Sequence, residues 1–310
     1  MKPISDIKPA RYIPEFDTGN IEEQEKLLLH LKQNKLLSWE VERLCELASV
    51  IVEKLIQRWQ EKFNGRLDPI PEWIELAEIY KKIFLGKSKL TWVQNLDSAI
   101  ENIWWASEDN TVVLQNHRSG LDWVIARLLL RDKMEGADDN IGFIASQVFE
   151  YCRPFSILTS GFRKYPVFPE KHIKTKQESV QNAMRRCNSA TYRALTKDYR
   201  QWGQVTFIYP EIDRWTWELG AINPTIPEIL KLMRKATKWK FSVVGSYIKW
   251  SEFALENWDS ARWIKNPFDS CFANLWISND IELSFGKPKE VWDKDEINED
   301  WIKRIILETK

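Results

Sequence analysis

The sequence predicts an α/β fold in which an N-terminal helical bundle precedes a largely parallel or mixed sheet flanked by helices. Two observations carry this prediction. Up to about residue 88, apolar residues recur at spacings of three and four, which is typical of amphipathic helices. From Asn110 onward, short runs rich in β-branched and aromatic residues alternate with helical stretches, as in domains built on a parallel sheet. The predicted domains are therefore a bundle over residues 1–88 and an α/β domain over residues 89–310.

The first part of the chain carries helix start and stop signals. Asn20, with Glu23 three residues later, forms a capping box that predicts the start of a helix. Gly65 is expected to end the second helix, and Pro71 suits the first turn of the third. The four segments with helical spacing, of which the last leads toward the second domain, are residues 21–34, 38–63, 72–84 and 91–108.

The second part of the chain predicts strands alternating with helices. The five expected strands lie at residues 111–115, 141–146, 162–168, 204–210 and 240–248. A long helix over residues 174–202 separates the third strand from the fourth, and a helix over residues 225–239 separates the fourth from the fifth. This alternation favours a largely parallel sheet, because parallel neighbours need a crossover connection.

Composition excludes several classes of protein. Lysine and arginine number 45, aspartate and glutamate also number 45, and this balance argues against a nucleic-acid-binding surface over the whole protein. No stretch approaches the roughly 18 apolar residues that a membrane-spanning helix needs. The first 25 residues lack the apolar segment of a secretory signal, so we expect a mature chain or a bacterial cytoplasmic one.

Metal and cofactor chemistry is not expected from the residue pattern. The three histidines and four cysteines are scattered and give no closed ligand set, and the cysteines include no C-x-x-C pair. The sequence also contains no glycine-rich phosphate loop and no G-x-S-x-G segment. We therefore predict no metal and no cofactor.

The segment NHRSGLDW is the sharpest candidate for a catalytic site. His117 follows the strand expected at residues 111–115, and Asp122 stands where the next helix begins. A carboxylate on one ring nitrogen fixes the imidazole tautomer and leaves the other nitrogen free as a general base. The alternative is that His117 bonds to the backbone in a tight turn while Asp122 caps a helix.

These residues resemble the first motif of the glycerolipid acyltransferase superfamily, which has the form H-x4-D and is here preceded by Asn116. Later segments support the resemblance in order and spacing. FIYPEIDR, which ends in Arg214, is similar to the strand-then-proline block of the family, and KFSVVGSYI occupies the place of its final strand. The resemblance implies transfer of a fatty acyl group from a thioester to a glycerol hydroxyl.

A closer resemblance is to the soluble, plastid-type glycerol-3-phosphate acyltransferases, in which a helical bundle also precedes the catalytic domain. CRPFSI, VFPEKHI and MRRCNSATYRAL are similar to segments of that subfamily. The resemblance implies His117 as catalytic base and Asp122 as its catalytic support, with Lys171, His172 and Arg214 holding the acceptor phosphate. It also implies acyl-acyl carrier protein or acyl-CoA as the donor substrate, sn-glycerol 3-phosphate as the acceptor, and no other cofactor.

Two other functions remain open. Glu211 resembles the Pro-Glu-Gly-Thr-Arg block of membrane-associated lysophosphatidate acyltransferases, with Ile212 and Asp213 in place of Gly-Thr, and this favours 1-acylglycerol 3-phosphate as acceptor. A catalytically silent lipid- or carrier-binding protein is the alternative of another class.

Two surface features indicate partners other than nucleic acid. A basic helix face suits acidic acyl carrier protein or anionic lipid, with a solvated amphipathic helix as the ordinary explanation, and it comprises Lys231, Arg234, Lys235 and Lys238. Aromatic residues that suit an acyl groove or peripheral contact with a membrane are Trp215, Trp217 and Trp250, with core packing as the ordinary explanation.

Overall fold

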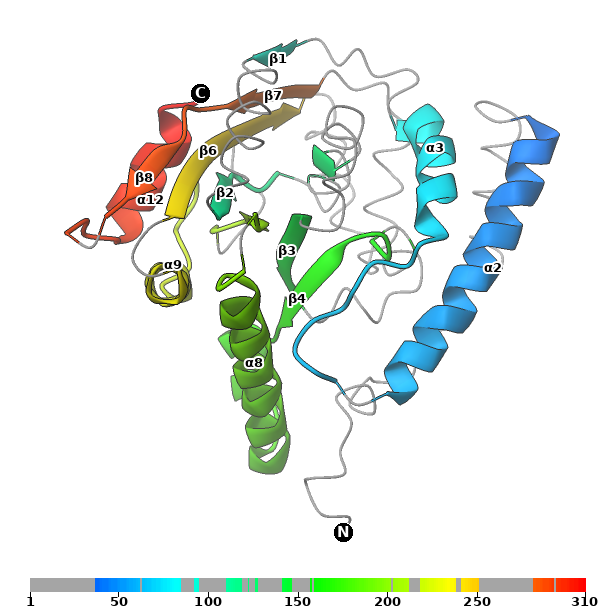
Figure 1. Ribbon diagram of the computed structural model, residues 1–310, viewed down its shortest axis with the longest axis horizontal. Coiled ribbons are helices and arrows are strands. Elements are labelled where there is room, and N and C mark those ends of the chain that lie inside the picture. Colours follow the sequence, from blue (N-terminus) through cyan, green and yellow to red (C-terminus); the bar gives the residue numbers. More distant parts are fainter. Residues whose placement is uncertain are drawn as a thin grey trace. The chain divides into compact units, whose positions relative to one another are not determined.

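The computed structural model divides the chain into two compact units. Figure 1 labels the helices and strands that are described below. One unit combines Met1–Gly86 with Ala145–Ala194, and the other combines Lys87–Ile144 with Leu195–Lys310. The residues that the structure describes are 37–61, 63–84, 92–94, 110–118, 122, 126–127, 141–146, 157, 159–201, 203–211, 218–237, 241–250, 281–292 and 294–310.

The second unit is built on parallel strands around β2 (Thr111–Gln115). β5 (Val205–Ile208) and β6 (Phe241–Trp250) flank β2 on either side, both parallel to it, and β3 (Ile141–Ser146) pairs in parallel with β5. All five residues of β2 are buried. Parallel strands that are covered on both faces read as continuous apolar runs, which is why the sequence predicts them well.

The other edge of this sheet is mixed. β7 (Ile281–Phe285) and β8 (Lys289–Val291) each pair antiparallel with β6, and β1 (Trp92–Gln94) pairs in parallel with β7. The resulting order is β1-β7-β6-β2-β5-β3, with β8 also beside β6. The predicted α/β class with a mostly parallel, mixed sheet and flanking helices is therefore confirmed.

The helix that the sequence predicts over residues 91–108 is wrong at its first residues. Residues 91–108 have helical spacing, but Trp92–Gln94 form strand β1, paired with Glu282–Ser284. Local spacing does not reveal a strand partner so far along the chain, and the tertiary pairing outweighs the local preference.

Two helices of the second unit bury apolar faces. α9 (Thr225–Ala236) buries Ile226, Pro227, Ile229, Leu230 and Met233. α12 (Glu299–Leu307) packs on β6 and β2 and buries Ile302, Ile305 and Ile306. Asn298 caps α12, because its side chain accepts a hydrogen bond from the Trp301 N–H at 2.8 Å.

Gly245 in β6 allows α12 to approach the sheet closely. A Cβ atom at Gly245 would overlap the backbone oxygen of Ile305 on α12. We expect Gly245→Ala to lower the free energy of unfolding by about 1–3 kcal/mol, because the helix backbone must move away. Urea denaturation measures this loss. Ser246→Ala, one residue along β6, is the control and should change stability little, because the structure gives its buried hydroxyl no partner among the described residues. Equal stability of Gly245→Ala and wild type would contradict the packing described.

In the first unit, two helices pack together: α2 (Ser38–Gln60) and α3 (Trp73–Phe84). α2 buries Leu44, Leu47, Ile51 and Leu55. Arg43 Nε and Nη2 donate to the two carboxylate oxygens of Glu75 on α3, at 2.7 and 2.5 Å. The helix predicted at residues 21–34 lies outside the described residues, so the N-terminal bundle as a whole stays a prediction.

The first unit also contains β4 (Arg163–Val167), α7 (Glu170–Lys174) and most of α8 (Glu178–Asp198). Thr191 of α8 donates to Pro166 O of β4 at 2.7 Å. Both strand β4 and helix α8 lie within segments that the sequence predicts, and α8 is shorter than its predicted range of residues 174–202.

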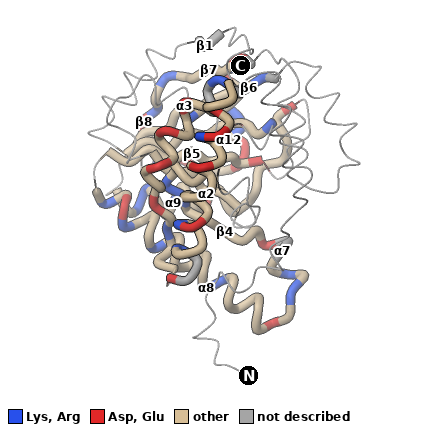
Figure 2. The backbone as a smooth tube through the Cα atoms, turned by 90° about the vertical axis from the view of Figure 1, so that its right-hand side faces the viewer, with Lys and Arg blue, Asp and Glu red and all other residues tan. Residues whose placement is uncertain are grey.

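Charged residues of both signs are interspersed along the described chain (Figure 2). Within the described residues, no helix has the length and apolarity needed to cross a membrane.

Candidate active site

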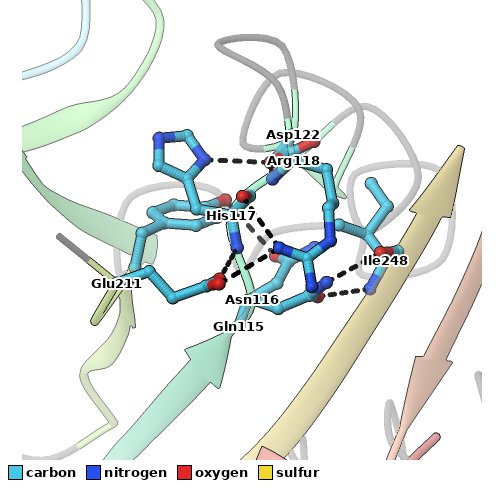
Figure 3. Close-up of polar contacts among 8 residues, drawn as sticks. Gln115, Asn116, His117, Arg118, Asp122, Glu211 and Ile248 are labelled. Atoms are coloured by element: carbon cyan, nitrogen blue, oxygen red, sulfur yellow. Dashed lines mark hydrogen bonds and ion pairs between the residues drawn. The ribbon is translucent and has the colours of Figure 1, made fainter. Parts of the chain in front are cut away.

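Asn116 fixes the point at which the chain leaves the sheet after β2. Its Nδ2 donates to Ile248 O at 2.8 Å, and its Oδ1 accepts from Ile248 N at 2.6 Å (Figure 3). β6 extends to Trp250 while β2 ends at Gln115, so the Asn116 side chain supplies the pairing that a longer β2 backbone would give. The next residue, His117, is therefore held at the carboxyl edge of the parallel strands, where ligands bind in open α/β sheets.

Loss of the Asn116 amide should be costly. We expect Asn116→Ala to lower the free energy of unfolding by about 2 kcal/mol, because the buried N–H and C=O of Ile248 both lose their partner. Asn223→Ala, which removes one exposed bond to Thr225 N, is the matched control and should cost less. Chemical denaturation of the two variants tests this. A smaller loss for Asn116→Ala than for the control would show that water replaces the amide.

His117 and Asp122 meet as the sequence predicts. His117 Nδ1 lies 2.9 Å from Asp122 Oδ2, and the Arg118 N–H donates to the same oxygen at 2.6 Å. The Asp122 side chain is fully buried, and that of His117 is 13% exposed. Because a carboxylate only accepts, the Nδ1 atom of neutral His117 carries the proton and Nε2 carries the lone pair.

Tyr209 lies against the imidazole. The ring centroids of His117 and Tyr209 are 4.9 Å apart, with planes inclined by 42°. The Tyr209 hydroxyl donates to Gln115 Oε1 at 3.3 Å. Burial, and secondarily the charge of Asp122, raise the pKa of Tyr209 well above its usual value, so the phenol stays a neutral donor. The sequence contains a signal for this neighbour, because Tyr209 follows β5 directly and β5 runs parallel to β2.

Arg118 and Glu211 form a buried ion pair next to the main chain of His117. Arg118 Nη1 donates to Glu211 Oε1 at 3.1 Å, and the two side chains are 3% and 0% exposed. Glu211 also accepts from the backbone N–H groups of His117 and Gly220, the latter at 2.8 Å. The Arg118 guanidinium carbon lies 5.8 Å from the centroid of the Tyr247 ring, within the range of a cation–π contact. The sequence indicates neither Arg118 nor the burial of Glu211, because both depend on the folding of distant segments onto one another.

For the other predicted site residues, the structure describes no side-chain position. Lys171 and His172 lie on α7, in the first unit, and their side chains are outside the described residues. Arg214, Trp215 and Trp217 also lie outside the described residues. The phosphate-binding role of Lys171, His172 and Arg214 therefore stays a prediction.

Metal ligands do not gather in the part of the chain that the structure describes: no three or more His, Cys, Asp and Glu side chains are placed to hold an ion there. Cys45 and Cys187 are free thiols.

The chain matches no model of a known protein family, and no curated protein matches it.

Proposed function

We propose that this protein is a glycerolipid O-acyltransferase that moves a fatty acyl group from acyl-acyl carrier protein or acyl-CoA to sn-glycerol 3-phosphate. The observation that carries the proposal is the 2.9 Å contact between His117 Nδ1 and Asp122 Oδ2. It leaves Nε2 as an oriented base at the carboxyl edge of the sheet. The order of segments that resemble glycerolipid acyltransferases supports the same reaction.

In the proposed reaction, His117 Nε2 takes the proton of the acceptor hydroxyl as the oxygen attacks the thioester carbonyl carbon. The tetrahedral intermediate then expels the donor thiol, which receives the proton from the imidazolium. Asp122 does not take this proton, but its buried negative charge stabilises the imidazolium. A thioester is already activated, so direct attack needs no acyl-enzyme and no metal or other cofactor.

The partners in the proposed reaction carry negative charge, so they call for cations on the protein. Lys171, His172 and Arg214 are proposed to hold the acceptor phosphate, since clustered cations bind phosphate through charge-assisted bonds. On α9, Lys231 pairs with Glu228 at 2.8 Å, while Arg234 Nη1 donates to the carbonyl groups of Trp292 and Asp295, both at 3.0 Å. Lys231 and Arg234 are thus bound within the protein, Lys235 is exposed, and Lys238 lies outside the described residues. Docking of acyl carrier protein or anionic lipid on this face is proposed from its positive charge alone.

The test is acyl transfer by the purified chain from labelled acyl-acyl carrier protein and from acyl-CoA. Glycerol 3-phosphate and 1-acylglycerol 3-phosphate are offered as separate acceptors. Product from glycerol 3-phosphate is the expected result, and product from 1-acylglycerol 3-phosphate alone would move the protein to the next acylation step. No product with either acceptor and either donor would reject the enzyme and favour a lipid- or carrier-binding protein.

A further inference from the structure

Glu211 directs its carboxylate at the main chain of the proposed catalytic histidine. Oε2 accepts from the His117 N–H, while Oε1 accepts from Arg118 Nη1 at 3.1 Å and from the Gly220 N–H at 2.8 Å. The Glu211 side chain is 0% exposed. Three donors from the protein itself thus occupy both carboxylate oxygens.

Two consecutive peptide groups are each bound by a buried carboxylate (Figure 3). The His117 N–H donates to Glu211, and the Arg118 N–H donates to Asp122. These two peptide planes are the ones on either side of the His117 Cα atom, so together they fix the direction of its Cα–Cβ bond. The contact between Nδ1 and Asp122 then fixes the ring about that bond.

We propose that Glu211 is a positioning residue for His117, holding its main chain so that Nε2 meets the acceptor hydroxyl, and that it does not contact the acceptor. This inference rests on the proposed acyl transfer. Arg118 neutralises Glu211 inside the protein, so the carboxylate does not repel a phosphate-bearing acceptor. The glutamate that resembles the lysophosphatidate block therefore acts on the base and leaves the choice of acceptor to other residues.

The first test compares the kinetics of Glu211→Gln with wild type. A glutamine offers only one oxygen, so its NH₂ group must face at least one of the three donors. We expect kcat to fall about 10²-fold while KM for glycerol 3-phosphate stays unchanged, because a misplaced base slows the chemical step without weakening binding. A raised KM with unchanged kcat would show that Glu211 binds the acceptor and would overturn the proposal.

Glu282→Gln is the matched control. Glu282 lies on β7 in the same unit and forms an exposed ion pair with Lys249 at 3.5 Å. Neither kcat nor KM should change in this variant. A loss equal to that of Glu211→Gln would mean that the effect is not specific to the bond with His117, and would overturn the proposal.

The second test measures the ring tautomer of His117 in the absence of substrate. The chain has three histidines, so ¹⁵N-labelled histidine gives three sets of ring signals, and His117→Gln identifies the set from His117. We expect wild-type His117 to show one tautomer, with the proton on Nδ1, and Glu211→Gln to show a mixture of tautomers. The signals of the other two histidines should stay in place.

Combining the tests separates the two proposals. A wild type without turnover, whose His117 signals nevertheless respond to Glu211→Gln, would reject the acyltransferase and keep the positioning role. An active wild type, with Glu211→Gln unchanged in kcat and in ring signals, would keep the acyltransferase and reject the positioning role.

If Glu211→Gln does not fold, Glu211→Asp takes its place in both the kinetic test and the tautomer test. It keeps the negative charge beside Arg118 but shortens the side chain by one methylene, which draws the carboxylate back from the His117 N–H. We expect a smaller fall in kcat, again with unchanged KM, and a partial change of tautomer. Wild-type values of both kcat and the ring signals in this variant would overturn the proposal.

Discussion

Replacing His117 with glutamine should lower kcat for acyl transfer by about 10²–10⁴-fold, the range that general base catalysis supplies. Glutamine keeps a polar side chain in a position that is only 13% exposed, but its amide cannot take a proton from the acceptor hydroxyl. The thioester remains open to slow attack by bound acceptor, so some turnover should persist. Steady-state kinetics with glycerol 3-phosphate measures the change.

His30→Gln is the control for this variant, since no role in the reaction is assigned to His30. Its kcat and KM should equal those of wild type. Far-UV circular dichroism and urea unfolding of His117→Gln should also match wild type, so that loss of activity reports loss of the base. Retention of full activity by a folded His117→Gln would show that another group removes the proton.

Replacing Arg118 with methionine should lower the free energy of unfolding by about 3–5 kcal/mol, the largest stability change that we expect. Methionine fills much of the space but leaves the Glu211 carboxylate buried without its cation. The two amides that remain, from His117 and Gly220, do not neutralise the charge. Urea unfolding followed by tryptophan fluorescence measures the loss.

Two comparisons make the Arg118 prediction specific. Lys249→Met breaks the exposed pair with Glu282 and should cost less than about 1 kcal/mol, because water screens that pair. Adding Glu211→Gln to Arg118→Met should recover part of the stability, since the double variant buries no unpaired charge. If Arg118→Met and Lys249→Met cost the same, the buried pair does not stabilise the fold as described.

The parallel strands around β2 were predictable and the strands of the mixed edge, β1, β7 and β8, were not, for a physical reason. β2 is buried along its whole length, and its three central residues, Val112, Val113 and Leu114, form an apolar run that is visible in the sequence. β1 has three residues and helical spacing around it, and only its pairing with β7 makes it a strand. A short edge strand leaves a weak local pattern because its stability comes from its partner.

In the candidate site, too, the contacts between residues close in sequence were predictable and those between distant segments were not. His117 and Asp122 are five residues apart, so one turn brings them together and the sequence reveals the pair. Glu211 reaches His117 across 94 positions and bonds to its backbone amide, which leaves no mark on the side-chain pattern at residue 117. The partner of Asn116 is likewise the main chain of Ile248, 132 positions away. Contacts between a side chain and a distant backbone cannot be read from residue types.

The pairing of β1 with β7 also affects how the chain folds. Trp92 and Glu282 are strand partners, and the chain between them makes this one of the most non-local contacts in the sheet. Non-local pairing slows folding, because a long loop must close before the contact forms. During synthesis on the ribosome, β1 emerges well before β7, the strand that it pairs with. The sheet of the second unit must therefore finish folding late, and in the interval its partly built edge is open to association with other chains.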